Sequence, residues 1–142
     1  MGTTYQDLQE TAERAHGARE AHDHAVRVAS YGLQSEVSDI LKMGSTHTGT
    51  SFAPKERLSI ADPTFDHDKR FHRSSATLRV FPNNKEVAVS VGFAYRVIRG
   101  VLVFAFEGEE NEAFPVEGRT PDFARKLVEA FEKKIAEYYS FG

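Results

Sequence analysis

Cysteine is absent from the 142 residues of this chain. Without cysteine the protein has no disulfide framework, no thiol nucleophile and no zinc–thiolate site. Long apolar runs are missing too, since none approaches the roughly 20 residues of a membrane-spanning helix. The N-terminus lacks a basic region followed by an apolar one, which is the pattern of a secretory signal. We therefore expect no membrane partner and a cytoplasmic location.

An excess of positive charge is also missing. The chain has 18 Lys and Arg against 21 Asp and Glu, so its formal net charge is −3. Proteins that bind nucleic acid generally carry a strong positive balance, and nucleic acid is therefore disfavoured as a partner. The hydrophobic content of 40% is ordinary for a globular protein, and the length suffices for one domain with its own core.

No catalytic or cofactor-binding motif stands out. The serines show no Gly-x-Ser-x-Gly elbow. The Ser/Thr/Gly-rich stretch 44–51 lacks the Gly-Lys-Ser/Thr ending of a nucleotide-binding loop, and it follows a predicted helix instead of preceding one. We therefore expect no catalytic residue, no metal and no cofactor, and favour a protein that is not an enzyme.

The N-terminal third of the chain shows the spacing of one long helix. Apolar or small side chains recur at steps of three and four residues between Leu8 and Ile40, which is typical of a helix with one buried stripe. A capping box of Thr3 and Gln6 predicts its start. Gly44, suited to the left-handed position after a helix, predicts its end.

The length of this helix limits how it can pack. About 38 helical residues would span roughly 57 Å. A compact domain of this size is somewhat under about 40 Å across. The helix therefore either breaks, at Gly17 or Gly32, or extends beyond its domain and packs on another subunit. We expect a break or kink near Gly17, where the apolar stripe is weakest.

The alanine-rich first half of this helix buries little by itself, so it needs a close partner surface. A homo-oligomer is the simplest source of one. His22 occupies a stripe position, and at a subunit interface it would make assembly sensitive to mild acid. The predicted interface residues are Leu8, Ala12, Ala15 and His22.

Three runs of β-branched and aromatic residues between 76 and 106 predict consecutive antiparallel strands. Asparagines at 83–84 and the stretch 98–100 predict the two turns. A short edge strand is predicted at 58–60, and Thr120-Pro121-Asp122 predicts the start of a C-terminal helix. The fold class is therefore α+β, with an N-terminal helix or helix pair, an antiparallel sheet of three to five strands and a C-terminal helix packed on the sheet. We expect a single domain made of a helical segment 1–43, a loop-rich segment 44–75, the sheet 76–117 and a helix 120–140.

The middle strand has two different faces. The alternating residues from Val87 to Val97 are large and must face the core. The opposite face carries only small side chains, which leaves space for a closely packed helix, a sister subunit or a ligand lying flat on the sheet. Of these we expect a helix. The small residues are Ala88, Ser90, Gly92 and Ala94.

The sharpest polar cluster lies at 66–73. Its alternating acids and imidazoles suit metal binding or acid–base work, and its arginines suit a phosphate. None of the known metal-ligand spacings is met, and a solvated polar loop is the simpler interpretation. If this cluster and the small face form a ligand site, its residues are His67, Arg70, His72, Arg73, Ser90 and Gly92.

Two functional hypotheses follow. The leading one is a small non-enzymatic binding or assembly protein, an accessory or inhibitory factor, that acts through protein–protein contacts as a homo-oligomer. It rests on the missing motifs, the long helix and the separate acidic (107–117) and basic (69–73) segments. The alternative is a small-molecule or nucleotide-phosphate binder, or an enzyme, with a site over the small face walled by the loops 44–54 and 62–75.

Overall fold

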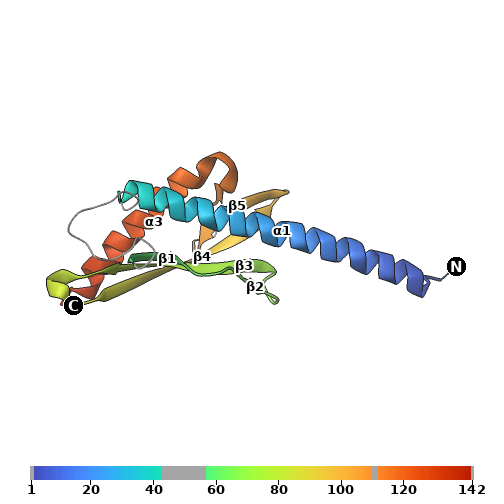
Figure 1. The fold of residues 1–142 in the computed structure, drawn as a ribbon, viewed down its shortest axis with the longest axis horizontal. Coiled ribbons are helices and arrows are strands. Elements are labelled where there is room, and N and C mark those ends of the chain that lie inside the picture. The colour runs from blue at the N-terminus through green and yellow to red at the C-terminus, as the bar shows by residue number, and fades with distance from the viewer. Residues whose placement is uncertain (1, 43–56, 110–111, 142) are drawn as a thin grey trace.

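A computed structural model describes residues 2–42, 57–109 and 112–141 of the chain. A long N-terminal helix is followed by an antiparallel sheet and a C-terminal helix that packs on the sheet, which confirms the predicted α+β class (Figure 1). The elements in chain order are α1 (Tyr5–Ile40), β1 (Leu58–Ile60), β2 (Thr64–Asp66), β3 (Phe71–Val80), the 3₁₀ turn η1 (Pro82–Asn84), β4 (Val87–Ile98), β5 (Val101–Phe106), β6 (Phe114–Pro115) and α3 (Val116–Tyr138).

The sheet has the order β1-β3-β4-β5-β6, and β2 also pairs with β3. The strands β1 and β2 lie one after the other along the same edge of β3, with Leu58 opposite Leu78 and Thr64 opposite Arg73. The sheet thus has six strands and begins at Leu58, so it includes much of the segment predicted as loop-rich. The strand β2 was missed because three residues are too few to show an alternating pattern.

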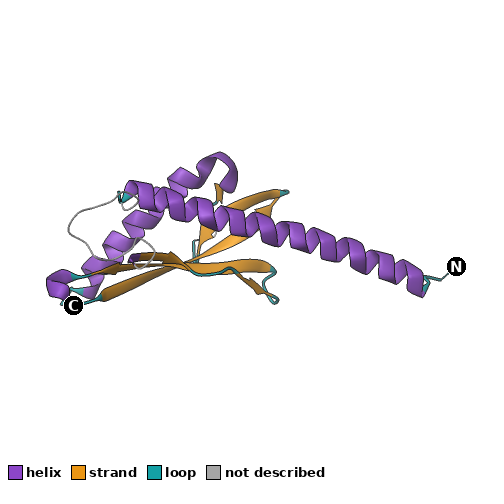
Figure 2. Ribbon diagram, viewed as in Figure 1, coloured by secondary structure: helices purple, strands orange, loops and turns teal. Residues whose placement is uncertain are grey.

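Both helices cover the same face of the sheet (Figure 2). They share with the sheet one hydrophobic cluster, in which aromatic rings from β4, β5 and α3 stack or meet edge to face. Burial of these rings contributes strongly to the stability of the core because each one removes a large apolar area from water. The largest fully buried side chains are Tyr95, Phe93, Phe104, Phe123, Phe131, Leu33, Leu58, Leu127, Val26 and Val37.

The two faces of β4 differ as the sequence indicated, but the small face is not covered by a helix. Val89, Phe93 and Tyr95 are buried beneath α1 and α3. On the other face, Ala88 and Ser90 are exposed. The prediction that a helix covers this face is wrong, because both described helices lie on the opposite side of the sheet.

Side chains from the neighbouring strands cover part of the small face instead. Arg73 on β3 and Glu107 after β5 reach across β4 and form an ion pair, with 2.7 Å between Nη2 and Oε1. A methyl group added to Gly92 would lie 2.7 Å from the Glu107 carboxylate. The small residue at this position therefore makes room for the ion pair.

The helix α1 runs without a break through Gly17 and Gly32 to Ile40. The expected break near Gly17 is wrong, because a single glycine in a helix costs only about 1 kcal/mol and good helix formers flank this one. Its capping box is formed by Thr4 and Asp7, one residue later than predicted. The predicted end at Gly44 lies outside the described residues.

The predicted turns and the C-terminal helix are largely confirmed. Asn83, Asn84 and Arg99 have positive φ angles, as the two tight turns require. The helix α3 ends at Tyr138 and begins at Val116, four residues before the predicted start. Residues 117 and 118 have non-helical backbone angles, so the continuous helix begins at Arg119, next to the predicted start.

Candidate functional site

The first half of α1 projects away from the rest of the molecule. Every residue from 5 to 18 is exposed, and Figure 1 shows this part of the helix extending past the sheet and α3. We call residues 5–18 the projecting segment. Its 14 residues span about 21 Å at 1.5 Å per residue. Tyr5 is 80% exposed and Leu8 is 58% exposed, so neither side chain is part of the core.

The exposed apolar stripe of this segment continues the buried face of the same helix. Leu8 lies 18 residues before Val26, and Ala15 lies 18 residues before Leu33. Eighteen residues make five turns at 3.6 residues per turn, so each pair points in the same direction. Val26 and Leu33 are fully buried against the sheet side. The contact face of α1 therefore continues for several turns beyond the edge of its own domain.

Within the described residues, little stabilises the projecting segment. Apart from the capping box, the structure gives it side-chain contacts between residues three or four positions apart, such as Gln6 with Glu10 and Gln9 with Glu13. Such contacts stabilise a helix by only about 0.2–0.5 kcal/mol each. A helical stretch this short is marginal in water without packing, and Gly17 within it weakens it further.

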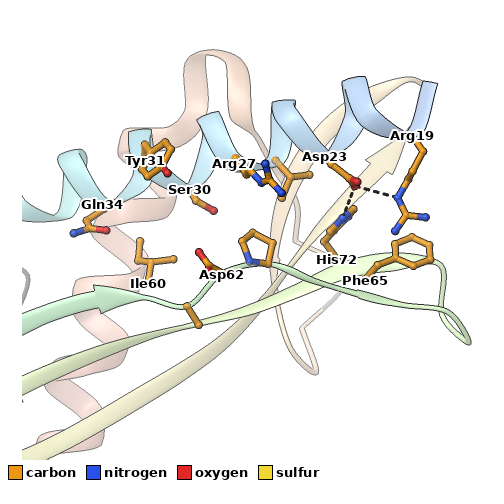
Figure 3. A pocket seen from close by; sticks show the side chains of 13 residues that line it. Arg19, Asp23, Arg27, Ser30, Tyr31, Gln34, Ile60, Asp62, Phe65 and His72 are labelled. Atoms are coloured by element: carbon orange, nitrogen blue, oxygen red, sulfur yellow. Dashed lines mark hydrogen bonds and ion pairs between the residues drawn. The ribbon is translucent and has the colours of Figure 1, made fainter. Parts of the chain in front are cut away.

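A polar cluster lies where the projecting segment meets the sheet. The carboxylate of Asp23 accepts hydrogen bonds from Arg19 Nε and from His72 Nε2, each at 3.0 Å (Figure 3). The Arg19 guanidinium lies 3.7 Å above the Phe65 ring, and the His22 ring is 5.0 Å from the His72 ring. These contacts join α1 to the hairpin of β2 and β3.

His72 is neutral in this cluster. Its side chain is on the inner face of β3 and the residue is only 4% exposed. Burial, together with electrostatic repulsion from the neighbouring His22, lowers the pKa of His72 below its ordinary value of 6.5, although the Asp23 carboxylate opposes this shift. Because a carboxylate only accepts, Nε2 carries the proton and Nδ1 is an acceptor. Among the residues that the structure describes, that buried Nδ1 has no hydrogen-bond partner.

The charge of Asp23 is well supported. Burial raises the pKa of Asp23, but the hydrogen bond and positive charge of Arg19 and the hydrogen bond from His72 outweigh burial, and the pKa is lower than usual. Deeper in the same interface the hydroxyls of Ser30 and Tyr95 hydrogen-bond to each other. Burial raises the pKa of Tyr95 to about 12.

A groove of about 470 Å³ lies between α1 and the segment from β1 to β2. The Asp23–His72 pair forms one end of it, and Figure 3 shows Gln34 and Ile60 toward the other end. Its volume is in the range of small-molecule sites. Arg27 lines it, and its walls are mixed polar and apolar. It is lined by Arg19, Asp23, Val26, Arg27, Ser30, Tyr31, Gln34, Ile60, Ala61, Asp62, Pro63, Phe65 and His72.

The structure divides the six predicted ligand-site residues among three places. His72 points inward beneath α1, whereas Arg73, Ser90 and Gly92 are on the outer face of the sheet. His67 and Arg70 belong to the turn between β2 and β3. The loop 44–54, expected to wall this site, lies outside the described residues.

The contacts within this divided set are local. The Arg70 guanidinium is 5.8 Å from the centre of the Phe65 ring, and His67 meets the same ring edge-on. Thr77 and Ser90 share a hydrogen bond of 2.8 Å across β3 and β4. The set therefore does not converge on one cavity.

The predicted interface residues are also placed. Leu8, Ala12 and Ala15 lie exposed on one side of the projecting segment, and His22 lies half-buried beside His72.

Sequence reasoning missed Asp23, Arg19 and Phe65 as members of the cluster around His72. Only the high density of histidine and acid near residue 22 signalled a site there, because pairing over 49 residues leaves no mark in local spacing.

Across residues 2–42, 57–109 and 112–141, no group of three or more His, Asp or Glu side chains is arranged to hold a metal ion. In the same residues no helix is both long and apolar enough to cross a bilayer. Comparison with family models, with curated proteins and with solved structures finds no match for this chain.

Proposed function

We propose that this is a non-enzymatic binding or assembly protein that works through protein–protein contact, as a homo-oligomer held by the projecting segment. One observation carries the proposal: the contact face of α1 continues past the domain and presents Leu8, Ala12 and Ala15 to solvent. Full burial of one leucine side chain contributes about 1.5–3 kcal/mol, so even this short stripe gains from a partner. A partner would also stabilise a helix that is marginal alone.

The acidic and basic segments contribute less to this proposal than the sequence indicated. Arg73 of the basic segment is paired with Glu107 of the acidic one, and Asp66 lies 3.7 Å from the same arginine. These charges are therefore partly satisfied within the chain. The residues of the projecting segment, by contrast, are all exposed to solvent.

A matched pair of substitutions tests the proposal. Ala12 and Ala21 are both exposed alanines in α1, nine residues apart, so they lie on opposite sides of the helix. Ala12→Asp places a charge in the stripe and should raise the dissociation constant of self-association at least about tenfold, or about 1.4 kcal/mol. Ala21→Asp should leave it unchanged. Sedimentation equilibrium measures both, and equal behaviour of the two variants would contradict the proposal.

A second candidate is small-molecule binding in the groove beside His72, rather than over the small face of the sheet. It is favoured by the buried Nδ1 of His72, which has no hydrogen-bond partner within the described part of the chain, and by the groove of about 470 Å³ that His72 lines. A thermal-shift screen with nucleotides and divalent cations tests it. Stabilisation that is lost in Arg27→Ala would support this site, and no stabilisation by any compound would count against it.

A further inference from the structure

The projecting segment carries acidic and basic residues in separate halves. Residues 5–13 hold Asp7, Glu10 and Glu13 and no lysine or arginine, whereas residues 14–18 hold Arg14 and no acid. Two such segments side by side in parallel would bring acid onto acid and base onto base. Placed antiparallel, the N-terminal end of each segment, which carries Asp7, lies beside the end of the other that carries Arg14.

We propose that two copies of this chain pair antiparallel along their projecting segments, about a twofold axis near residues 11 and 12. This rests on the proposed function and adds the direction and register of the contact. The pairing is isologous, which is the usual form of a closed dimer.

The sizes of the stripe residues favour the same arrangement. Leu8 and Ala15 are seven residues apart on one side of the helix, so an antiparallel pair with this axis sets each Leu8 against the partner's Ala15. A large side chain then meets a small one at both ends, which fills space efficiently. Ala12 lies near the axis, where two alanines let the helices approach closely. A parallel pair would instead set leucine on leucine and leave alanine facing alanine.

The charges beside the stripe agree with this register. Asp7 and Arg14 are also seven residues apart, so they lie on one side of the helix. In the antiparallel pair Asp7 of one copy therefore lies near Arg14 of the other. Both are exposed, so the pair selects the direction more than it adds affinity.

The ends of the free stripe set the register independently. The free length of the helix begins at its cap, Thr4. It ends at Arg19, which lies over Phe65 and is bonded to Asp23. Antiparallel helices that overlap along this whole free length are centred midway between residues 4 and 19. That midpoint falls between residues 11 and 12, where the side-chain sizes also place the axis.

Engineered cysteines test direction and register, because the chain has none of its own. A disulfide needs Cα atoms about 4.4–6.8 Å apart. Under oxidised glutathione, Ala12→Cys should form a covalent dimer with itself. Leu8→Cys and Ala15→Cys should each stay mostly unlinked, because two copies of either position lie about 10 Å apart along the axis. An equimolar mixture of those two variants should link efficiently.

The control and the contrary outcomes are distinct. Ala21→Cys, on the opposite side of the helix, should not link. If the wild-type chain is a dimer but Leu8→Cys and Ala15→Cys each link with themselves, the antiparallel arrangement is overturned while the proposed function stands. A dimer that links at none of these positions would show that the second copy binds elsewhere. A wild-type chain that is monomeric would overturn both.

Discussion

At the scale of single residues, His72 connects the projecting helix to the sheet. Its ring is buried, its Nε2 donates to Asp23 of α1, and it meets the half-buried ring of His22. Burial keeps it neutral, so protonation of this ring would place an unfavourable charge beneath α1. The stability of the contact between α1 and β3, at the foot of the projecting segment, should therefore depend on pH.

This dependence gives a prediction for stability. The folded pKa of His72 lies below its unfolded value of 6.5, so the unfolded chain binds the proton more readily. The contribution to the free energy of unfolding is thus present above the unfolded pKa, and it is lost as pH falls below about 6.5 toward the folded pKa. Asp23 adds a separate loss only below its own unfolded value of 3.8.

Urea unfolding at several pH values between about 7.5 and 5.5 measures the effect. His72→Gln should flatten the decline in stability over this range, whatever its effect on stability itself. The matched variant His24→Gln, at an exposed position of the same helix, should keep the decline. An unchanged decline in His72→Gln would show that another group is responsible.

The small face of β4 shows which residue details the sequence could indicate. Alternation predicted correctly that Gly92 and Ala94 face away from the core. It did not predict what covers them, because Arg73 and Glu107 come together from strands on either side of β4. Contacts between distant residues depend on strand order, which local patterns do not contain.

At the scale of elements, α1 shows what helical periodicity predicts well and poorly. The stripe from Val26 to Val37 is buried as the spacing indicated. The same spacing from Leu8 to Ala15 predicted a contact face but not its partner. The position of Gly17 suggested a break, yet the cost of one glycine is too small to end a helix that has formers on both sides.

Gly17 gives a second prediction. A methyl group added there would meet nothing within 4 Å, and the position is on the side of α1 opposite the stripe. Gly17→Ala should therefore stabilise the helical state locally by about 1 kcal/mol. Hydrogen exchange of amides in residues 5–18 should slow about fivefold, while self-association stays at least as tight. Unchanged exchange there would mean that the helix is already held by other contacts.

The two short edge strands also show what a local sequence pattern can and cannot predict. Leu58–Ile60 was predicted because two apolar residues flank a polar one and a proline follows at 63, whereas Thr64–Asp66 was not predicted. The latter is a strand only because β3 continues past the end of β1 and offers free backbone groups. Because this stretch was interpreted as a loop, the hairpin of β2 and β3 that brings Phe65 beneath Arg19 was not predicted.

At the scale of the whole molecule, length alone indicated the most important feature. A helix that runs straight for 36 residues is longer than the domain it belongs to. The structure puts the excess at the N-terminal end, where the helix face that packs in the core continues into solvent (Figure 1). We therefore predict that the isolated chain is an incomplete assembly.

The molar mass of the wild-type chain in solution tests this claim most directly. Size-exclusion chromatography with light scattering, over a range of micromolar concentrations, should give a mass that rises toward twice the 15.9 kDa of one chain. The projecting stripe would then be covered in solution. A mass that stays at 15.9 kDa across the whole range would contradict the account.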